Sequence, residues 1–395
     1  LPLEQVGIYS AINSGWILLR ALGPLGMDML LLRGGALADS GASVRLYVRY
    51  ILAVLFALAL VCGALALWLL DASWPLVMLS LCGILLYAMI GFLSACLLAE
   101  ERPVAANAPD ALGLPGGVIV LLSALLWLDT ASLELLLCGQ MVTALVVVLW
   151  YGLQVRRSLR RARATADVQI PSLRSQAKEG FAIWGNVALN NLILRLPVML
   201  APWLIGAANT ALLETALRFA SLLGLLHWAV SYALMPRLAR AYREGHSASL
   251  QDLLTIGSFI SALPTLLGLV LLTLIGKPLI MLLAQPEYVA AYVPMLILAA
   301  GISINACSGP LAQLYNLTGK QALARRIYAG ELGLLLLLLL LAAPVYGPLG
   351  AALAVTAALL YRNVRLNRSL ETALQLRPPF YSRKGWHYWR GRHGQ

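Results

Sequence analysis

Polar side chains that interrupt long apolar runs are the residues of this sequence best suited to chemistry. Arg20 lies within the first apolar run and shares one face of a predicted helix with Asn13 and Trp16, at spacings i, i+3 and i+7. A charge in the hydrocarbon core of a membrane costs at least about 2.5–3.5 kcal/mol, so it normally faces a cavity or a partner. Arginine binds phosphate through two parallel hydrogen bonds, and tryptophan offers a flat apolar face to a sugar ring or an isoprenoid. This stripe therefore suits an amphipathic anion with a large polar head.

A second stripe of the same composition lies in a later apolar run. Trp184, Asn191 and Arg195 share one helical face at spacings i, i+7 and i+11. The two stripes do not occupy repeat-equivalent positions. We expect Arg20 and Arg195 to line a substrate cavity. The alternative is a buried arginine whose guanidinium donates hydrogen bonds to helix carbonyls.

Membrane carboxylates offer candidates for ion coupling. Glu214 and Arg218 form an i, i+4 pair, which indicates either a cavity-lining Arg218 with an ion site at Glu214 or a pair that neutralises itself in the membrane. Asp28 lies near the end of its predicted helix, where it could bind an ion or pair with Arg33. Glu331 lies near the end of a run, and we expect it to reach the membrane interface by snorkelling. These residues form no carboxylate dyad.

The ninth apolar run has an unusual number of polar side chains. Either hydrogen bonds between helices or a water-filled lumen would explain them. They are Asn305, Ser308, Gln313 and Asn316.

No pattern in the sequence indicates catalysis, a metal or a cofactor. The four histidines form no HxxH or HExxH arrangement, and no Walker A sequence is present. The five cysteines lie in apolar runs at spacings that fit neither a metal site nor a disulfide framework. We therefore predict no catalytic residues, no metal, no cofactor and a protein that is not an enzyme.

The composition identifies a membrane protein. The chain has 395 residues, of which 61% are hydrophobic and 12% charged, and its mean hydropathy is +0.81. Soluble domains carry about 25% charged residues, so this chain could not hide its apolar surface from water. The net charge of +12 lies between the apolar runs, which favours a topology signal over nucleic-acid binding.

Eleven apolar runs are long enough to cross about 30 Å of hydrocarbon. Because backbone polar groups in lipid must be satisfied within their own segment, we expect every run to be a helix and the fold to be all-α and polytopic. The predicted spans are 8–32, 48–70, 76–98, 111–128, 132–154, 180–205, 209–235, 253–275, 293–315, 328–345 and 348–366.

Lysine and arginine are concentrated in alternate loops and in the C-terminal tail, which places these parts, including the C-terminus, in the cytoplasm. An odd number of spans then puts Leu1 outside, and one further helix upstream would give twelve spans. The sequence of helix, basic loop and helix at 3–43 aligns without gaps on 207–247, which indicates two parallel repeats. The predicted domains are an N-lobe at 1–154, a basic cytoplasmic linker at 155–179, a C-lobe at 180–368 and a basic aromatic tail at 369–395.

Two short segments resemble a known family. The first is Glu4-x-x-Gly7-Ile8-Tyr9, leading into a helix that ends Leu31-Leu32-Arg33. It resembles the start of the second helix in the polysaccharide (O-antigen and exopolysaccharide) flippases of the multidrug/oligosaccharidyl-lipid/polysaccharide exporter superfamily. The second is Thr215–Ala220 followed by Met235–Ala239, which looks like the family segment after helix seven, although the usual Gly-x-Tyr is Ala211-Leu212-Leu213 here.

The resemblance implies a flippase that moves polyprenyl-diphosphate-linked oligosaccharide across the bacterial inner membrane by alternating access. Its expected partners are this lipid-linked glycan, anionic inner-leaflet lipids beside the tail, and polysaccharide polymerase and export proteins, with no nucleic acid. The nearest alternative is a multidrug or cation antiporter of the same superfamily, which should show carboxylates facing the lumen. An alternative of another class is a membrane-embedded polysaccharide polymerase or ligase, which would need a large outward loop.

Overall fold

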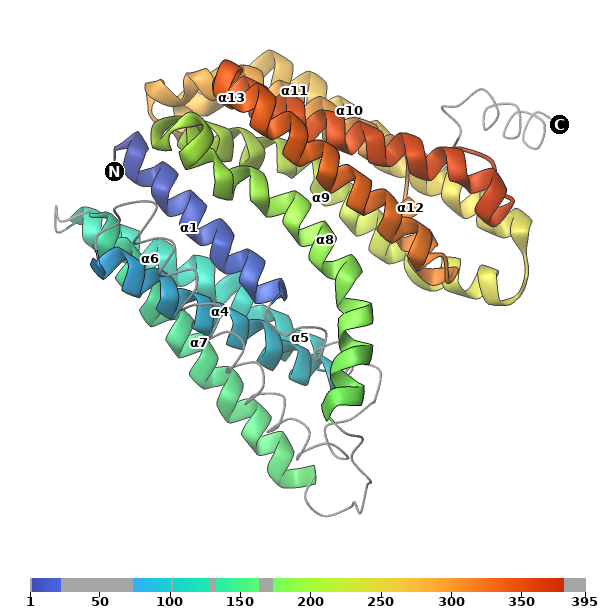
Figure 1. Cartoon of the computed structure of the whole chain (residues 1–395), viewed down its shortest axis with the longest axis horizontal. Coiled ribbons are helices and arrows are strands. Elements are labelled where there is room, and N and C mark those ends of the chain that lie inside the picture. The colour runs from blue at the N-terminus through green and yellow to red at the C-terminus, as the bar shows by residue number, and fades with distance from the viewer. Residues whose placement is uncertain (1, 23–73, 101, 128–131, 163–172, 380–395) are drawn as a thin grey trace. The chain divides into compact units, whose positions relative to one another are not determined.

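The computed structural model describes residues 2–22, 74–100, 102–127, 132–162 and 173–379 (Figure 1). These residues form helices and their connections, and no strand occurs among them. The fold is that of an all-α polytopic membrane protein. Contacts divide the chain into two compact units, Leu1–Arg195 and Leu196–Gln395, so that one long helix begins in unit 1 and ends in unit 2.

Unit 1 is a bundle in which one helix is central. This helix, α4, packs against α1 on one side and against α7 on the other. This helix is apolar on all its faces, as expected for a buried helix. The members of the unit are α1 (Leu3–Leu22), α4 (Trp74–Ala99), α5 (Pro103–Ala108), η2 (Pro109–Gly113), α6 (Leu114–Trp127), α7 (Leu133–Ala162) and the first part of α8 (Leu173–Ile205).

Two glycines on one face of α4 allow α1 to approach closely. A Cβ atom at Gly83 would lie 2.1 Å from Cε2 of Trp16, and one at Gly91 would lie 2.3 Å from the carbonyl oxygen of Arg20. Small residues let membrane helices pack backbone to backbone, since lipid supplies no hydrophobic drive for association. The position of the stripe on α1 is therefore fixed by its fit against α4.

A π-turn interrupts the helical rod formed by α5, η2 and α6. The turn covers Pro109–Gly113, and Pro109 is its first residue. Proline has no N–H to donate and its ring crowds the preceding turn, which explains a wider turn at this point. Single π-turns inside α-helices frequently mark functional sites because they rotate one side chain out of register. Asp110 is the acidic residue of this turn.

Unit 2 is built on three helices that pack against one another, α9, α10 and α11, with α13 covering α11. The connections between them are short, as in the bundle folds of membrane proteins. The members of the unit are α9 (Ala207–Arg243), α10 (Ser247–Leu283), η3 (Pro286–Ala291), α11 (Tyr292–Cys307), α12 (Leu311–Leu317) and α13 (Gln321–Leu374).

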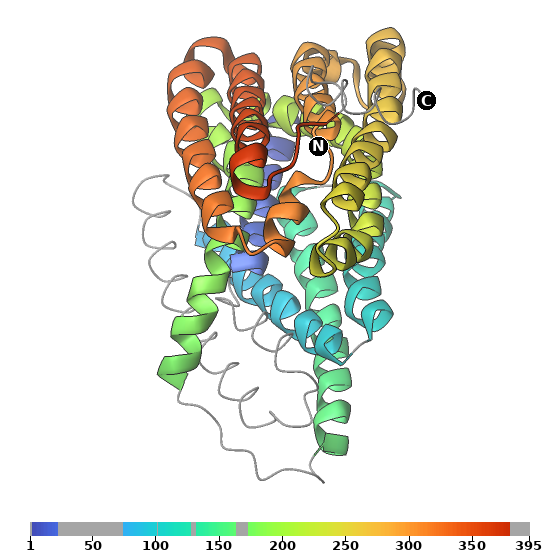
Figure 2. The same cartoon turned by 90° about the vertical axis from the view of Figure 1, so that its right-hand side faces the viewer.

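The 54-residue α13 is a helical hairpin. Its backbone leaves the helical region at Gly347, with φ 59° and ψ −137°. Beyond that point the chain returns along itself, so that a Cβ at Gly330 would lie 2.4 Å from the hydroxyl oxygen of Tyr361. Figures 1 and 2 both show the two arms side by side. The arms correspond to the predicted spans 328–345 and 348–366.

Eight helices of the described part are long and apolar enough to cross a membrane, and they overlap nine of the eleven predicted spans. The run predicted at 293–315 is shorter than expected. Its helix ends at Cys307, because Gly309 adopts φ +69° and Pro310 cannot continue the helix. The run at 48–70, the end of the run at 8–32, part of the linker at 155–179, and residues 380–395 of the tail lie outside the described residues.

Candidate functional site

Arg20 forms an ion pair with Asp110 in unit 1. Both terminal nitrogens of the guanidinium contact the carboxylate, Nη1 with Oδ1 and Nη2 with Oδ2. The end of α1 places the arginine, and the π-turn places the aspartate. The Arg20 side chain remains 29% exposed and that of Asp110 is 16% exposed. The arginine is therefore accessible but has an internal carboxylate in the position that a phosphate would take.

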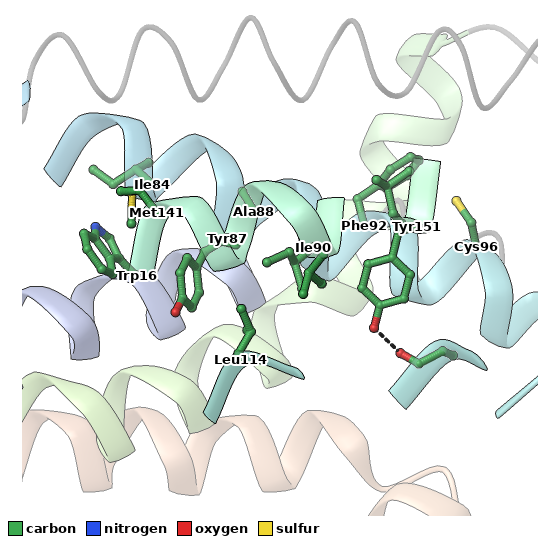
Figure 3. Packing of buried hydrophobic residues seen from close by; sticks show 14 of the residues in the cluster. Trp16, Ile84, Tyr87, Ala88, Ile90, Phe92, Cys96, Leu114, Met141 and Tyr151 are labelled. Atoms are coloured by element: carbon green, nitrogen blue, oxygen red, sulfur yellow. Dashed lines mark hydrogen bonds between the residues drawn. The ribbon is translucent and has the colours of Figure 1, made fainter. Parts of the chain in front are cut away.

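Asn13 and Trp16 belong to a hydrogen-bonded network on the same side of α1. Gln140 Nε2 donates to Asn13 Oδ1 at 2.9 Å and to the hydroxyl oxygen of Tyr87 at 2.7 Å. Trp16 Nε1 donates to the carbonyl oxygen of Ser80 at 3.0 Å, and its ring stacks on Tyr87 with centroids 5.5 Å apart (Figure 3). Trp16 is only 1% exposed. In this conformation its flat face is covered by protein, so we leave it out of the proposed substrate surface.

The second stripe is placed by α8. Trp184 Nε1 donates to the carbonyl oxygen of Leu22 at 3.0 Å, which ties α8 to the end of α1 two residues beyond Arg20. Asn191 and Arg195 follow on the same helix and are both partly exposed. Unit 1 thus contains both predicted arginines. Their joint use as a cavity wall stays a prediction.

The Glu214–Arg218 pair lies on α9 in unit 2. Arg218 Nε donates to Glu214 Oε1 at 2.8 Å, and the Arg218 side chain is 62% exposed. This geometry agrees with the self-neutralising alternative, because the carboxylate of Glu214 is already paired with Arg218. Asp28, the other candidate for ion coupling, lies outside the described residues.

A buried ion pair connects the two arms of the α13 hairpin in unit 2. Arg362 Nη1 lies 3.2 Å from Glu331 Oε1, and Arg362 Nη2 donates to Asn305 Oδ1 at 3.1 Å. The side chains of Arg362 and Glu331 are 12% and 0% exposed. The expectation that Glu331 snorkels to the interface is wrong, because the carboxylate is held inside the hairpin by this arginine.

Further polar groups extend this cluster along α11 and α9. Asn367 Nδ2 donates to Ser308 Oγ at 3.2 Å, so two of the polar residues of the ninth run, Asn305 and Ser308, form hydrogen bonds between helices. His227 and Ser231 lie one turn apart on α9, are buried, and have ring Nδ1 and Oγ atoms without a hydrogen-bond partner. The described part of unit 2 therefore has an internal polar layer within a membrane bundle.

Three important residues were not predicted from the sequence: Asp110, Gln140 and Arg362. Asp110 directly follows a proline inside an apolar segment, which is a signal for a helix irregularity. Gln140 interrupts the run at 132–154, and Arg362 interrupts the run at 348–366. Gln140 and Arg362 could have been noticed by the same rule that identified Arg20, whereas Asp110 lies just before the predicted span 111–128. Among the described residues, no group of three or more histidine, cysteine, aspartate or glutamate side chains could hold a metal ion.

No protein-family model matches the chain, and no curated protein matches it. Several solved structures are similar to the chain. The lipid II flippase MurJ, in an inward closed conformation, is similar with a TM-score of 0.75 at 13% sequence identity, over 94% of this chain and 82% of that chain.

Two MATE transporters are also similar. An inward-facing transporter of the MATE family in the MOP superfamily gives a TM-score of 0.69 at 15% identity, over 94% of this chain and 93% of that chain. A variant of the Vibrio cholerae MATE transporter VcmN gives 0.55 at 16% identity, over 94% of this chain and 87% of that chain. At such identities the likeness establishes the fold, which these transporters share with this chain.

Proposed function

We propose that this protein is a flippase for polyprenyl-diphosphate-linked oligosaccharide in the bacterial inner membrane. It would belong with the polysaccharide flippases, have a cytoplasmic C-terminus and work by alternating access. The observation that carries the proposal is the accessible Arg20 in the last turn of α1 in unit 1, in a chain whose fold is shared with a lipid II flippase. A diphosphate is the group that such an arginine binds through two parallel hydrogen bonds.

Asp110 gives this site a reversible counter-ion. When no substrate is bound, the carboxylate satisfies Arg20 and lowers the penalty for a charge in the membrane. An incoming diphosphate carries more negative charge than one carboxylate and can replace it. When the substrate leaves, the ion pair between Asp110 and Arg20 forms again, so release does not leave an unpaired charge. Arg195, Asn191 and Asn13 would supply further contacts to the phosphates and the sugar.

A multidrug or cation antiporter is the second candidate, because the chain covers 93% of a MATE transporter of similar length. Such a protein needs membrane carboxylates that can bind a cation. In the described helices, Asp110, Glu214 and Glu331 each pair with an arginine of the same unit. This pairing favours an anionic substrate over a free cation.

The test is transport by the full chain in proteoliposomes that contain a fluorescent polyprenyl-diphosphate oligosaccharide. Dithionite added outside quenches only the labelled lipid in the outer leaflet. Flipping is therefore measured as the decrease in the fraction of fluorescence that dithionite cannot quench. Replacing Arg20 with alanine should slow flipping by about tenfold or more, the loss expected from one hydrogen bond to a charged group. Arg20→Lys should retain part of the activity, since it keeps the charge but not the two parallel hydrogen bonds.

The matched control is Arg240→Ala, because Arg240 lies at the exposed end of α9 and pairs with the exposed Glu244. It should flip at the rate of the unmodified chain. Equal flipping by the Arg20→Ala and control variants would refute the assignment of Arg20. Proton- or sodium-driven uptake of a cationic dye, without flipping of the glycan, would refute the assignment as a flippase and support the assignment as an antiporter.

A further inference from the structure

A groove on the surface of unit 1 is separate from the Arg20 site. It has a volume of about 440 Å³, lies between α5 and α7, and is open to the surface. Its walls are almost entirely apolar, and one charged side chain stands at its edge. The lining residues are Arg102, Val104, Ala105, Ala108, Pro109 and Trp150.

The groove continues a lipid-facing surface. One face of α7 consists of exposed apolar side chains at helical spacing: Val142, Leu145, Val146, Leu149 and Leu153. In a membrane-spanning helix, an exposed stripe of this composition faces acyl chains. Trp150 lies between the last two of these residues in sequence and forms the groove wall next to the stripe. An acyl chain lying on α7 can therefore enter the groove without crossing water.

The charged end of the groove fits a phosphate. Arg102 is 42% exposed, and its guanidinium reaches Gln154 Oε1 at 3.4 Å and Glu100 Oε2 only at 3.9 Å. These long contacts leave donors of the guanidinium available. Arg156 and Arg157 follow on the exposed end of α7, so the positive-inside rule places this end at the cytoplasmic leaflet. Tryptophan beside arginine is typical of the depth at which lipid headgroups lie.

We propose that this groove binds one anionic glycerophospholipid of the cytoplasmic leaflet. Arg102 holds the phosphate, and one acyl chain lies against Val104, Ala108 and Trp150. Complementary charge at one end and continuity with the lipid-facing stripe at the other select this occupant. Pro109 also lines the groove and begins the π-turn that carries Asp110. The bound lipid therefore contacts the turn that positions the counter-ion of Arg20.

Native mass spectrometry of the purified full chain tests this site. The chain is titrated in detergent with phosphatidylglycerol or with phosphatidylethanolamine of the same acyl chains, and bound lipids are counted. One phosphatidylglycerol should be retained at lower concentration than any phosphatidylethanolamine. Arg102→Gln should weaken its retention by about tenfold, the effect of one hydrogen bond to a charged group. Val104→Trp should weaken it as well, because Val104 is 77% exposed and a larger side chain there narrows the groove without entering the core.

Arg156→Gln is the matched control, since it removes an exposed arginine from the same end of α7 but not from the groove. It should leave the tight lipid in place. Equal retention by Arg102→Gln and Arg156→Gln would overturn the site, as would equal retention of the two lipids by the unmodified chain. Preferential capture of undecaprenyl phosphate, abolished by Val104→Trp, would overturn the assignment to a glycerophospholipid. None of these outcomes depends on whether the chain flips a glycan.

Discussion

Replacing Arg362 with methionine should destabilise unit 2 strongly, because it would leave Glu331 charged and buried between the arms of the α13 hairpin. The nearest charged atoms are 3.2 Å apart. At an effective dielectric constant of about 20, their attraction is about 5 kcal/mol. Removal of one partner from a buried pair typically lowers stability by about 3–5 kcal/mol, since the other charge loses its compensation. We expect a decrease in that range for the free energy of unfolding.

The reverse change should be milder. Glu331→Gln leaves a neutral amide in the hairpin, and Arg362 keeps its hydrogen bond to Asn305 at 3.1 Å. We expect a loss of about 1–3 kcal/mol, the penalty for weakening one buried polar contact. The double variant Glu331→Gln with Arg362→Met should recover most of the stability lost in Arg362→Met, because buried pairs replaced as a unit are often nearly neutral.

Equilibrium unfolding in mixed micelles of dodecylmaltoside and SDS, followed by circular dichroism, measures these differences. Arg365→Met is the matched control, since Arg365 lies one turn further along the same arm and is exposed. It should change stability by no more than about 0.5 kcal/mol. The reasoning fails if Arg362→Met is no more harmful than this control. It also fails if the double variant loses the sum of the two single losses.

Further variants probe packing within each unit. Gln251→Ala should free the segment after α13 and lower stability by about 1–2 kcal/mol, because the Gln251 amide donates to the Arg377 carbonyl at 3.1 Å and accepts from its N–H at 2.7 Å. Limited chymotrypsin digestion with mass spectrometry should show faster cleavage after Leu376. Gly83→Ala should cost about 1–3 kcal/mol by overpacking against Trp16. Gly152→Ala, with no atom within 4 Å of its added Cβ, should be neutral or stabilising in the same unfolding assay in SDS mixed micelles.

The membrane spans could be predicted from the sequence because one physical quantity decides them. A run long enough to cross the hydrocarbon must satisfy its own backbone, so apolar length alone predicts a helix. The end of α11 departs from this rule, since the apolar run continues past Cys307 while the backbone turns at Gly309. The Gly309–Pro310 pair was the local signal for that break, and apolar length does not detect it.

An ion pair can be predicted from the sequence only where a simple local geometry, such as a helical hairpin, brings its two residues together. Glu331 and Arg362 lie 16 and 15 residues from Gly347, so two antiparallel arms of equal length must place them opposite each other. The two spans and the glycine between them would have sufficed to predict this contact, but the position of Glu331 near the end of its run led us to expect snorkelling instead. Arg20 and Asp110 are 90 residues apart, and their meeting depends on a π-turn and on the packing of α1 against α4. No local pattern encodes such a contact.

The ion pairs in the described helices differ in exposure, and this difference bears on which of them an anion can reach. In unit 2, the side chains of Arg362 and Glu331 are 12% and 0% exposed, so this pair stabilises the α13 hairpin. In unit 1, the side chain of Arg20 is 29% exposed and that of its partner Asp110 is 16% exposed. An accessible arginine in a medium of low dielectric attracts an anion more strongly than it would in water. If the chain is a flippase, as we propose, we therefore expect the diphosphate to bind at Arg20 and not at Arg362.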